Sequence, residues 1–189
     1  EPGTVDPREA ATLLDERLPP SVGVVSSANA HSCAFRIMLM KKPRALQVYV
    51  SAFGCIGQAL ATGIGVAVGA DGPVACIDGD GSALQNIQEL DTAARLGLKF
   101  LYVVMNDEAY GAEYHKLLAK KRDGRLSVVR SPDFAGLARD FGCRGRSART
   151  LEELAAGVDE FLAGDGPMVI DLRISRNVIS IPYRRVNYG

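Results

Sequence analysis

Short apolar runs alternate along the chain with segments of helical character. The runs predict strands over residues 22–26, 46–50, 74–78, 100–105 and 167–172. The segments between and after them predict helices over residues 34–40, 57–68, 83–95, 133–141 and 150–162. Alternation of strand and helix at this rhythm is typical of a mostly parallel sheet with helices on both faces. The pattern therefore predicts a doubly wound α/β fold.

Three of these segments carry sharper signals. In residues 83–95 the apolar side chains recur at the three- to four-residue spacing of an amphipathic helix. The strand at 100–105 is apolar without interruption, as expected when both faces of a strand are buried. Thr150 and Glu153 have the spacing of a capping box at the start of the last helix. Folds of this class bind ligands at the carboxyl edge of the sheet, so function is sought where the strands end.

Length and charge narrow the function classes. The chain has 189 residues, enough for one domain with its own core, and residues 175–189 are taken as a C-terminal tail of that domain. Its 22 basic and 22 acidic residues cancel, so we expect neither nucleic acid nor a membrane as a partner. The longest apolar stretch, residues 59–68, is too short to cross a bilayer. A basic run at 116–125 lacks aromatic residues and predicts a solvated helix-to-loop face.

The cysteines give no sign of a metal cluster. Cys33, Cys55, Cys76 and Cys143 include no C-x-x-C pair, which argues against a zinc or iron–sulfur site. Two of them, Cys55 and Cys76, lie in apolar runs and predict reduced, buried thiols. The first residues contain no basic or apolar leader segment, and we expect a cytoplasmic protein.

The third predicted strand ends in a glycine-rich turn, Asp78-Gly79-Asp80-Gly81-Ser82. Glycines let the backbone approach a ligand closely, and the N–H groups at the start of the next helix favour an anion such as phosphate. Asp80 would repel that anion unless a cation lay between them, which points to Mg²⁺ or Ca²⁺ bridging the protein to a diphosphate. A plain helix entry capped by Asp is the alternative that so short a motif leaves open.

The fourth predicted strand ends in residues 105–111, which include Asp107. If the third and fourth strands are parallel neighbours, Asp107 lies near Asp80 at the same edge. Oxygen ligands from two strand ends and a loop carbonyl would form half of a Mg²⁺ coordination shell, which phosphate oxygens and water would complete.

Together these motifs resemble a family signature. Gly79-Asp80-Gly81, followed after 24 residues by Asn106-Asp107, resembles the diphosphate-binding motif of thiamine-diphosphate-dependent enzymes. Residues 88–90 and 101–105 are also similar to that family, and residues 54–57 resemble the segment that cradles the aminopyrimidine ring of the cofactor. The resemblance covers about residues 20–175 and is nearest to the acetolactate synthase and benzaldehyde lyase group. It implies the same doubly wound fold.

The resemblance also implies roles for single residues. Asp80 and Asp107 would ligate Mg²⁺ through their side chains, and Ala109 through its backbone carbonyl. The diphosphate would be bound by the turn that comprises Gly79, Asp80, Gly81 and Ser82. Where the family usually has Asn, this chain has Asp107. The second carboxylate makes the site more negative and should still hold Mg²⁺.

Further roles concern the organic part of the cofactor. The carbonyl of Gly54 would accept a hydrogen bond from the aminopyrimidine, and Ile56 would be the apolar wedge that keeps the cofactor bent. Tyr110 would cover the cofactor or pack as an ordinary aromatic. His31, with Asn29 in the same loop, follows the first strand and would contact the cofactor or stay solvated.

Catalysis in this family needs a glutamate that hydrogen-bonds the aminopyrimidine, and no segment of this chain resembles the domain that carries it. We therefore expect no catalytic residue here. The pyrimidine-binding domain with that glutamate would lie in a longer chain, of which this is the C-terminal part, or in a partner subunit. The resemblance further implies a homo-oligomer, because the family's sites lie between domains of paired subunits.

The implied activity is that of a lyase or transferase acting on a 2-oxo acid or aldehyde, by 2-oxo-acid decarboxylation and carboligation. Two alternatives remain. The chain could be the cofactor-binding subunit of a split 2-oxo-acid decarboxylase, or a non-catalytic module that keeps the cofactor pocket.

Two remaining regions have blander interpretations. His115 follows the proposed metal loop and is expected on a helix surface. Arg176, Arg184 and Arg185 in the tail would suit an acidic substrate if the tail folded over the site, but a disordered terminus is the default expectation.

Overall fold

A computed structural model describes residues 1–27 and 33–189 of the chain. Its centre is a six-stranded sheet in which each of the described pairings is parallel. In spatial order the strands are β2 (Gln47–Val50), β1 (Gly23–Ser27), β3 (Val74–Gly79), β4 (Phe100–Asn106), β6 (Met168–Arg173) and β5 (Arg144–Ala148). The parallel order places the carboxyl ends of all these strands at one edge.

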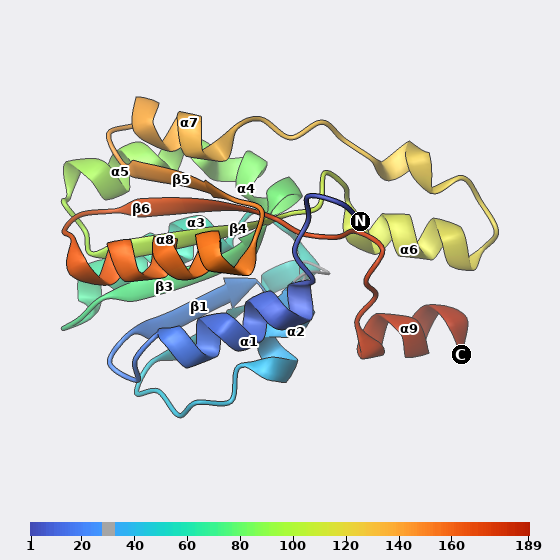
Figure 1. The fold of residues 1–189 in the computed structure, drawn as a ribbon, viewed down its shortest axis with the longest axis horizontal. Coiled ribbons are helices and arrows are strands. Elements are labelled where there is room, and N and C mark those ends of the chain that lie inside the picture. Colours follow the sequence, from blue (N-terminus) through green and yellow to red (C-terminus); the bar gives the residue numbers. More distant parts are fainter. Residues whose placement is uncertain (28–32) are drawn as a thin grey trace.

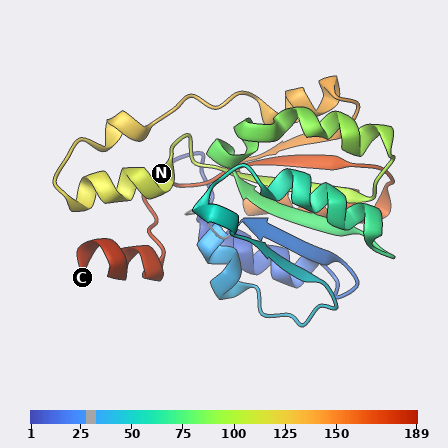
Figure 2. The same cartoon turned by 180° about the vertical axis from the view of Figure 1, so that it is seen from behind.

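Helices cover both faces of the sheet, as Figures 1 and 2 show from opposite sides. One face carries α1 (Pro7–Arg17), α2 (Cys33–Leu39) and α8 (Leu151–Ala163). The other carries α3 (Ala59–Gly69), α4 (Asp80–Asn86), α5 (Leu90–Arg95) and α7 (Phe134–Asp140). The predicted doubly wound α/β fold is therefore confirmed.

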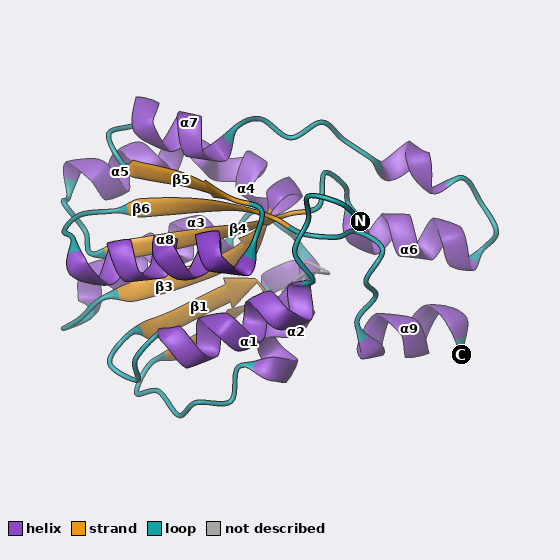
Figure 3. Cartoon of the chain, viewed as in Figure 1, coloured by secondary structure: helices purple, strands orange, loops and turns teal. Residues whose placement is uncertain are grey.

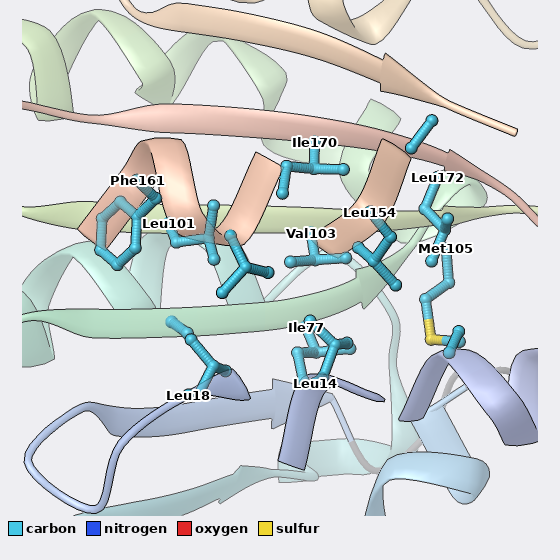
Figure 4. Close-up of a cluster of buried hydrophobic side chains, with 14 of the residues drawn as sticks. Leu14, Leu18, Ile77, Leu101, Val103, Met105, Leu154, Phe161, Ile170 and Leu172 are labelled. Carbon is cyan, nitrogen blue, oxygen red and sulfur yellow. The ribbon is translucent and has the colours of Figure 1, made fainter. Parts of the chain in front are cut away.

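The core consists of two apolar layers, one on each side of the sheet. Alternate residues of β4 face opposite layers, since successive side chains of a strand point to opposite faces. Figure 4 shows the layer beneath α1 and α8, where Leu14 and Phe161 close over the strand residues Val103 and Ile170. All of β4 is buried, which confirms the expectation from its uninterrupted apolar run.

The five predicted strands are all present within one residue of their expected bounds, but the predicted helix at 83–95 is wrong in part. It is divided into α4, a 3₁₀ turn at Ile87–Glu89 and α5. The break occurs at Asn86, whose φ of −142° is not helical, and whose side chain donates to the carbonyl of Gly57 instead.

The structure also contains elements that the apolar pattern did not predict. The strand β5 has the polar sequence Arg-Gly-Arg-Ser-Ala and lies at the sheet edge, where little burial is required. Helix α1 begins at Pro7 behind an Asp6 N-cap, and α6 (Gly111–Ala119) follows β4. One half of the expected capping box of α8 is present, since Thr150 Oγ1 accepts from Glu153 N–H at 3.2 Å, while the Glu153 carboxylate accepts from the N–H of Arg149, one residue before the N-cap, at 2.6 Å.

At the carboxyl edge, α6 and the 3₁₀ turn at Gly124–Ser127 extend beyond the sheet, with long connecting loops visible in Figure 3. Helix α9 (Ile181–Tyr188) packs beside α6, so the default expectation of a disordered terminus is wrong for these residues. The surface placement of His115 is also wrong. It is only 4% exposed where α6 meets α9, and burial lowers the pKa of its imidazole.

Of the remaining expectations, some are confirmed and one is wrong. The basic run at 116–125 is largely exposed, as expected. Cys33, Cys76 and Cys143 are buried thiols outside any disulfide, as is the thiol of Cys55, but Cys55 is exposed because it lies in the loop between β2 and α3. None of the helices in the described part of the chain has the length and apolar character needed to cross a membrane.

Candidate functional site

Two buried carboxylates meet where β3 and β4 end. The strands are parallel neighbours, and Gly79 of β3 is in register with Met105 of β4. Asp80 directly follows Gly79, and Asp107 lies two residues beyond Met105, so both carboxylates are at the same edge of the sheet. Their exposed fractions are 2% and 6%. The juxtaposition expected from the sequence is therefore present.

The electrostatics of this pair are unfavourable without a cation. Burial raises the pKa of Asp80, although a hydrogen bond from Ser131 Oγ at 2.8 Å opposes the rise. Burial, and then the neighbouring charge of Asp80, raise the pKa of Asp107 to about 8. Two carboxylates that resist ionisation side by side are suited to a hard divalent cation, which would remove both penalties.

The described residues contain no group of three or more His, Cys, Asp or Glu side chains that could hold a metal by themselves. A cation at Asp80 and Asp107 would therefore need other oxygen ligands. A backbone carbonyl, phosphate oxygens and water are the ligands that Mg²⁺ ordinarily adds to one or two carboxylates. The donor set fits the expected shared Mg²⁺–diphosphate site.

The loop after β4 is held rigidly. Ala109 N–H donates to Asp107 Oδ1 at 3.0 Å, and Ala109 itself is buried. Glu108, between them, has a positive φ of 52°, a strained value for a residue with a side chain. Its carboxylate pairs with Arg173 and, at 3.6 Å, with Arg176, and its carbonyl accepts from Val129 N–H at 2.9 Å.

The turn after β3 forms the buried N-terminus of α4. Gly79 caps α4 in an extended conformation, and Gly81 and Ser82 lie in the first turn of the helix, where N–H groups lack intrahelical acceptors. The ring of Tyr110 packs directly on Gly81, because a Cβ there would be 2.9 Å from the ring. Tyr110 is 38% exposed and so forms part of the wall of this turn.

The hydroxyl of Ser82 points into the protein. It donates to Asp78 Oδ2 at 2.8 Å and accepts from the N–H of Gly57 at 2.8 Å. Its single proton is committed to Asp78, so the expected role of Ser82 toward a diphosphate narrows to its backbone N–H.

Residues 54–57 reach this turn from the end of β2, which is separated from β3 by β1 in the sheet. They follow β2 and a 3₁₀ turn at Ala52–Gly54, and they cross to α4, where Gly57 is buried. Gly54 is exposed with a positive φ of 66°, and Ile56 is half-buried. The segment similar to an aminopyrimidine cradle thus lies against the glycine-rich turn. His31 and Asn29 lie outside the described residues.

A cavity of about 360 Å³ lies beside the carboxylate pair, at the ends of β4, β5 and β6. It is lined by both charge types, including Arg149, Arg173 and Asp171. Asn106 faces this side, since its amide donates to Asp171 Oδ1 at 2.9 Å. The cavity was not foreseen, and it contains neither Asp80 nor Asp107 in its lining.

Sequence reasoning also missed Ser131, Glu108, Asp78 and Tyr102 as parts of the site. Ser131 contacts Asp80 across 51 positions of sequence, a pairing that no local pattern reveals. The sequence motif assigns no role to Asp78, which accepts from the hydroxyl of Tyr102 at 3.0 Å. A charged residue at the end of an otherwise apolar strand is the signal that could have identified it.

Comparison with known proteins places the chain. Residues 27–172 match the family model described as thiamine pyrophosphate enzyme, C-terminal TPP binding domain. A putative acetolactate synthase large subunit of Mycobacterium tuberculosis is 29% identical over 177 residues, which cover 93% of this chain and 32% of that protein. The acetolactate synthase isozyme 2 large subunit of Escherichia coli is 31% identical over 127 residues, covering 66% and 23%.

Solved structures show the same fold. The thiamine diphosphate-dependent 4-hydroxybenzoylformate decarboxylase of Rhodococcus jostii RHA1 superposes with a TM-score of 0.84 at 24% identity, over 93% of this chain and 33% of that one. Benzoylformate decarboxylase of Polynucleobacter necessarius gives 0.80 at 21% identity, over 93% and 34%. The chain spans about a quarter to a third of these proteins. It belongs to the family of C-terminal TPP binding domains of thiamine pyrophosphate enzymes.

Proposed function

We propose that this chain binds the diphosphate of thiamine diphosphate through Mg²⁺, as one part of an acetolactate synthase-like enzyme. The enzyme would form or cleave C–C bonds next to a carbonyl in 2-oxo acids or aldehydes, as a lyase or transferase. The observation that carries the proposal is the buried carboxylate pair Asp80 and Asp107 at two adjacent strand ends, beside a glycine-rich turn at the start of α4.

The metal would be held by the side chains of Asp80 and Asp107 and by the carbonyl of Ala109. Both carboxyl groups are buried and have raised pKa values. A divalent cation bound between them would lower both pKa values and would be attracted by the two negative charges. The ion pairs of Glu108 support this role, since they hold the loop between the two proposed ligands. Asp107 in place of the family's usual Asn adds negative charge and increases the dependence on the cation.

The diphosphate would lie against the turn of Gly79, Gly81 and Ser82, next to Tyr110, with the backbone N–H of Ser82 as a donor, because the N–H of Gly79 already donates to Asp78 Oδ1. Gly54 would accept from the aminopyrimidine and Ile56 would support the bent cofactor, with His31 as a further contact. When bound, thiamine diphosphate supplies a thiazolium carbon that adds to carbonyl carbon and stabilises the resulting negative charge. The residues of this chain would bind and orient the cofactor.

The activating glutamate would come from a pyrimidine-binding domain, in a longer chain or in a partner subunit, and the site would form between paired subunits of a homo-oligomer. The partial coverage of the relatives supports this part of the proposal. We also propose a cytoplasmic location, where the thiols of Cys33, Cys76 and Cys143 stay reduced.

Calorimetric titration with thiamine diphosphate, with and without Mg²⁺, tests the assignment. We expect binding that requires Mg²⁺ and is lost in Asp80→Ala. Asp165→Asn is the matched control, because it removes an exposed carboxylate between α8 and β6 and should bind as the wild type does. Binding that persists without Mg²⁺, or survives Asp80→Ala, would contradict the proposed metal bridge.

A further inference from the structure

Asp78 is a carboxylate at the end of β3 with no exposed surface. Its oxygens accept three hydrogen bonds. Gly79 N–H donates to Oδ1 at 2.9 Å, while Ser82 Oγ at 2.8 Å and the hydroxyl of Tyr102 at 3.0 Å donate to Oδ2. The proposed function gives this group no role, although Asp78 lies at the base of the turn that would bind the diphosphate.

The carboxylate dictates the direction of the Ser82 hydroxyl. A carboxylate can only accept, so Ser82 must give its proton to Asp78 and keep its lone pairs for another donor. That donor is the N–H of Gly57, at 2.8 Å. A chain of hydrogen bonds therefore runs from Tyr102 through Asp78 and Ser82 to the backbone of residues 54–57.

Gly57 is held a second time by the same helix. Asn86, at the end of α4, donates from its side chain to the carbonyl of Gly57. The φ of Gly57 is +93°, and a Cβ there would be 2.6 Å from the Cβ of Gln85. The backbone N–H and the backbone carbonyl of Gly57 are thus both bonded to α4, and the missing Cβ of Gly57 allows the segment to pack closely on that helix.

We propose that Asp78 and Ser82 are positioning residues that lock residues 54–57 to the first turn of α4. This inference rests on the proposed function, in which that turn binds the diphosphate and residues 54–57 support the aminopyrimidine. Both ends of one cofactor would then be held at a fixed separation by a single short helix. The lock contributes to binding only for a ligand that contacts both parts.

Binding of two different ligands distinguishes the effect of the lock from the effect of the diphosphate-binding turn. Inorganic diphosphate with Mg²⁺ needs the turn and the metal ligands, whereas thiamine diphosphate with Mg²⁺ also needs residues 54–57. For Ser82→Ala we expect the Kd of thiamine diphosphate to rise about tenfold, the equivalent of one buried hydrogen bond, while the Kd of inorganic diphosphate changes less than about twofold. Asp78→Asn should show the same split, because an amide no longer forces the Ser82 proton inward.

Thr92→Val is the matched control. It removes a hydroxyl of α5 that bonds Glu89 at 2.9 Å, in the same helical run but away from residues 54–57, and should leave both affinities unchanged. Equal weakening of both ligands by Ser82→Ala would overturn the inference, since Ser82 would then support only the diphosphate turn. Unchanged affinity for both would overturn it as well.

A second measurement needs no ligand. Hydrogen exchange of the peptide that contains Gly57 should be about tenfold faster in Ser82→Ala than in the wild type, with no change in β5. Unchanged exchange at Gly57 would overturn the lock and leave the proposed function standing. A wild-type chain that binds neither ligand, with or without its partner domain, would overturn the proposed function and this inference together.

Discussion

The carboxylate pair leads to a quantitative prediction about protons. Because burial and the charge of Asp80 raise the pKa of Asp107 to about 8, the metal-free pair retains a proton at neutral pH. A carboxylate must lose its proton to ligate Mg²⁺, so binding should release it. With that pKa, Asp107 is protonated in about 0.9 of the molecules at pH 7 and in about 0.1 at pH 9.

The release can be measured by titrating Mg²⁺ and thiamine diphosphate in two buffers with different ionisation enthalpies. The dependence of the observed heat on the buffer gives the number of protons released. The ligand also carries protons, so the informative quantity is the difference between the wild type and Asp107→Asn, which has the amide usual in the family. We expect this difference to be about 0.9 proton at pH 7 and about 0.1 at pH 9.

Asp165→Asn serves again as the matched control, because it removes the same charge far from the metal loop and should release as many protons as the wild type. If the wild type and Asp107→Asn both bind and release equal numbers of protons at pH 7, the metal-free pair is already ionised. The argument from burial would then be refuted.

The other predictions concern stability. The side chain of Arg44 is 1% exposed, pairs with the carboxylate of Asp15 and donates to the carbonyls of Leu18 and Pro19. Arg44→Ala should therefore lower the free energy of urea unfolding by about 3–5 kcal/mol. Arg17→Ala, which breaks an exposed ion pair, should lower it by less than about 1 kcal/mol. Equal costs would contradict this ranking. In Gly145→Ala a Cβ would lie 2.0 Å from a carbonyl oxygen of α7 and should lower the Tm, while Gly65→Ala, in open space within α3, should add about 0.5–1 kcal/mol. A stabilised Gly145→Ala would show that α7 can shift. The raised pKa of Asp107 means that the folded state binds this proton more tightly than the unfolded chain, so the contribution is stabilising in acid and is lost as the pH rises from about 4 through about 8. Without Mg²⁺, the Tm of the wild type should therefore fall relative to Asp107→Asn between pH 6 and about 9, and parallel Tm profiles would contradict the sign.

Sequence patterns predicted the parts of the fold that depend on burial. The five apolar strands are present because a strand covered on both faces needs apolar residues at nearly every position. The edge strand β5 does not need apolar residues at every position, and its two arginines gave it no apolar run from which a strand could be predicted. The break at Asn86 was missed because it depends on a contact with Gly57, which the apolar spacing of α4 and α5 does not record.

The candidate site shows the same division. Asp80 and Asp107 could be paired from sequence, because parallel neighbouring strands end at one edge. Ser131 and the partners of Glu108 reach the site from segments far along the chain, and no local rule brings them there. His115 is buried because α9 packs beside α6. The sequence predicted no helix in the tail, and for that reason it also predicted an exposed His115.

The all-parallel sheet has a consequence for how this site comes into being during folding. Parallel pairing requires a crossover between partners, so the contacts that join β3, β4 and β6 have large sequence separations and form late and slowly. Asp80 and Asp107 come together only after that assembly, and a nascent or partly folded chain therefore has no preformed place for the cofactor. A ligand at this edge will accordingly stabilise the domain as one cooperative unit, by an amount that grows with the logarithm of one plus the ratio of its concentration to its Kd.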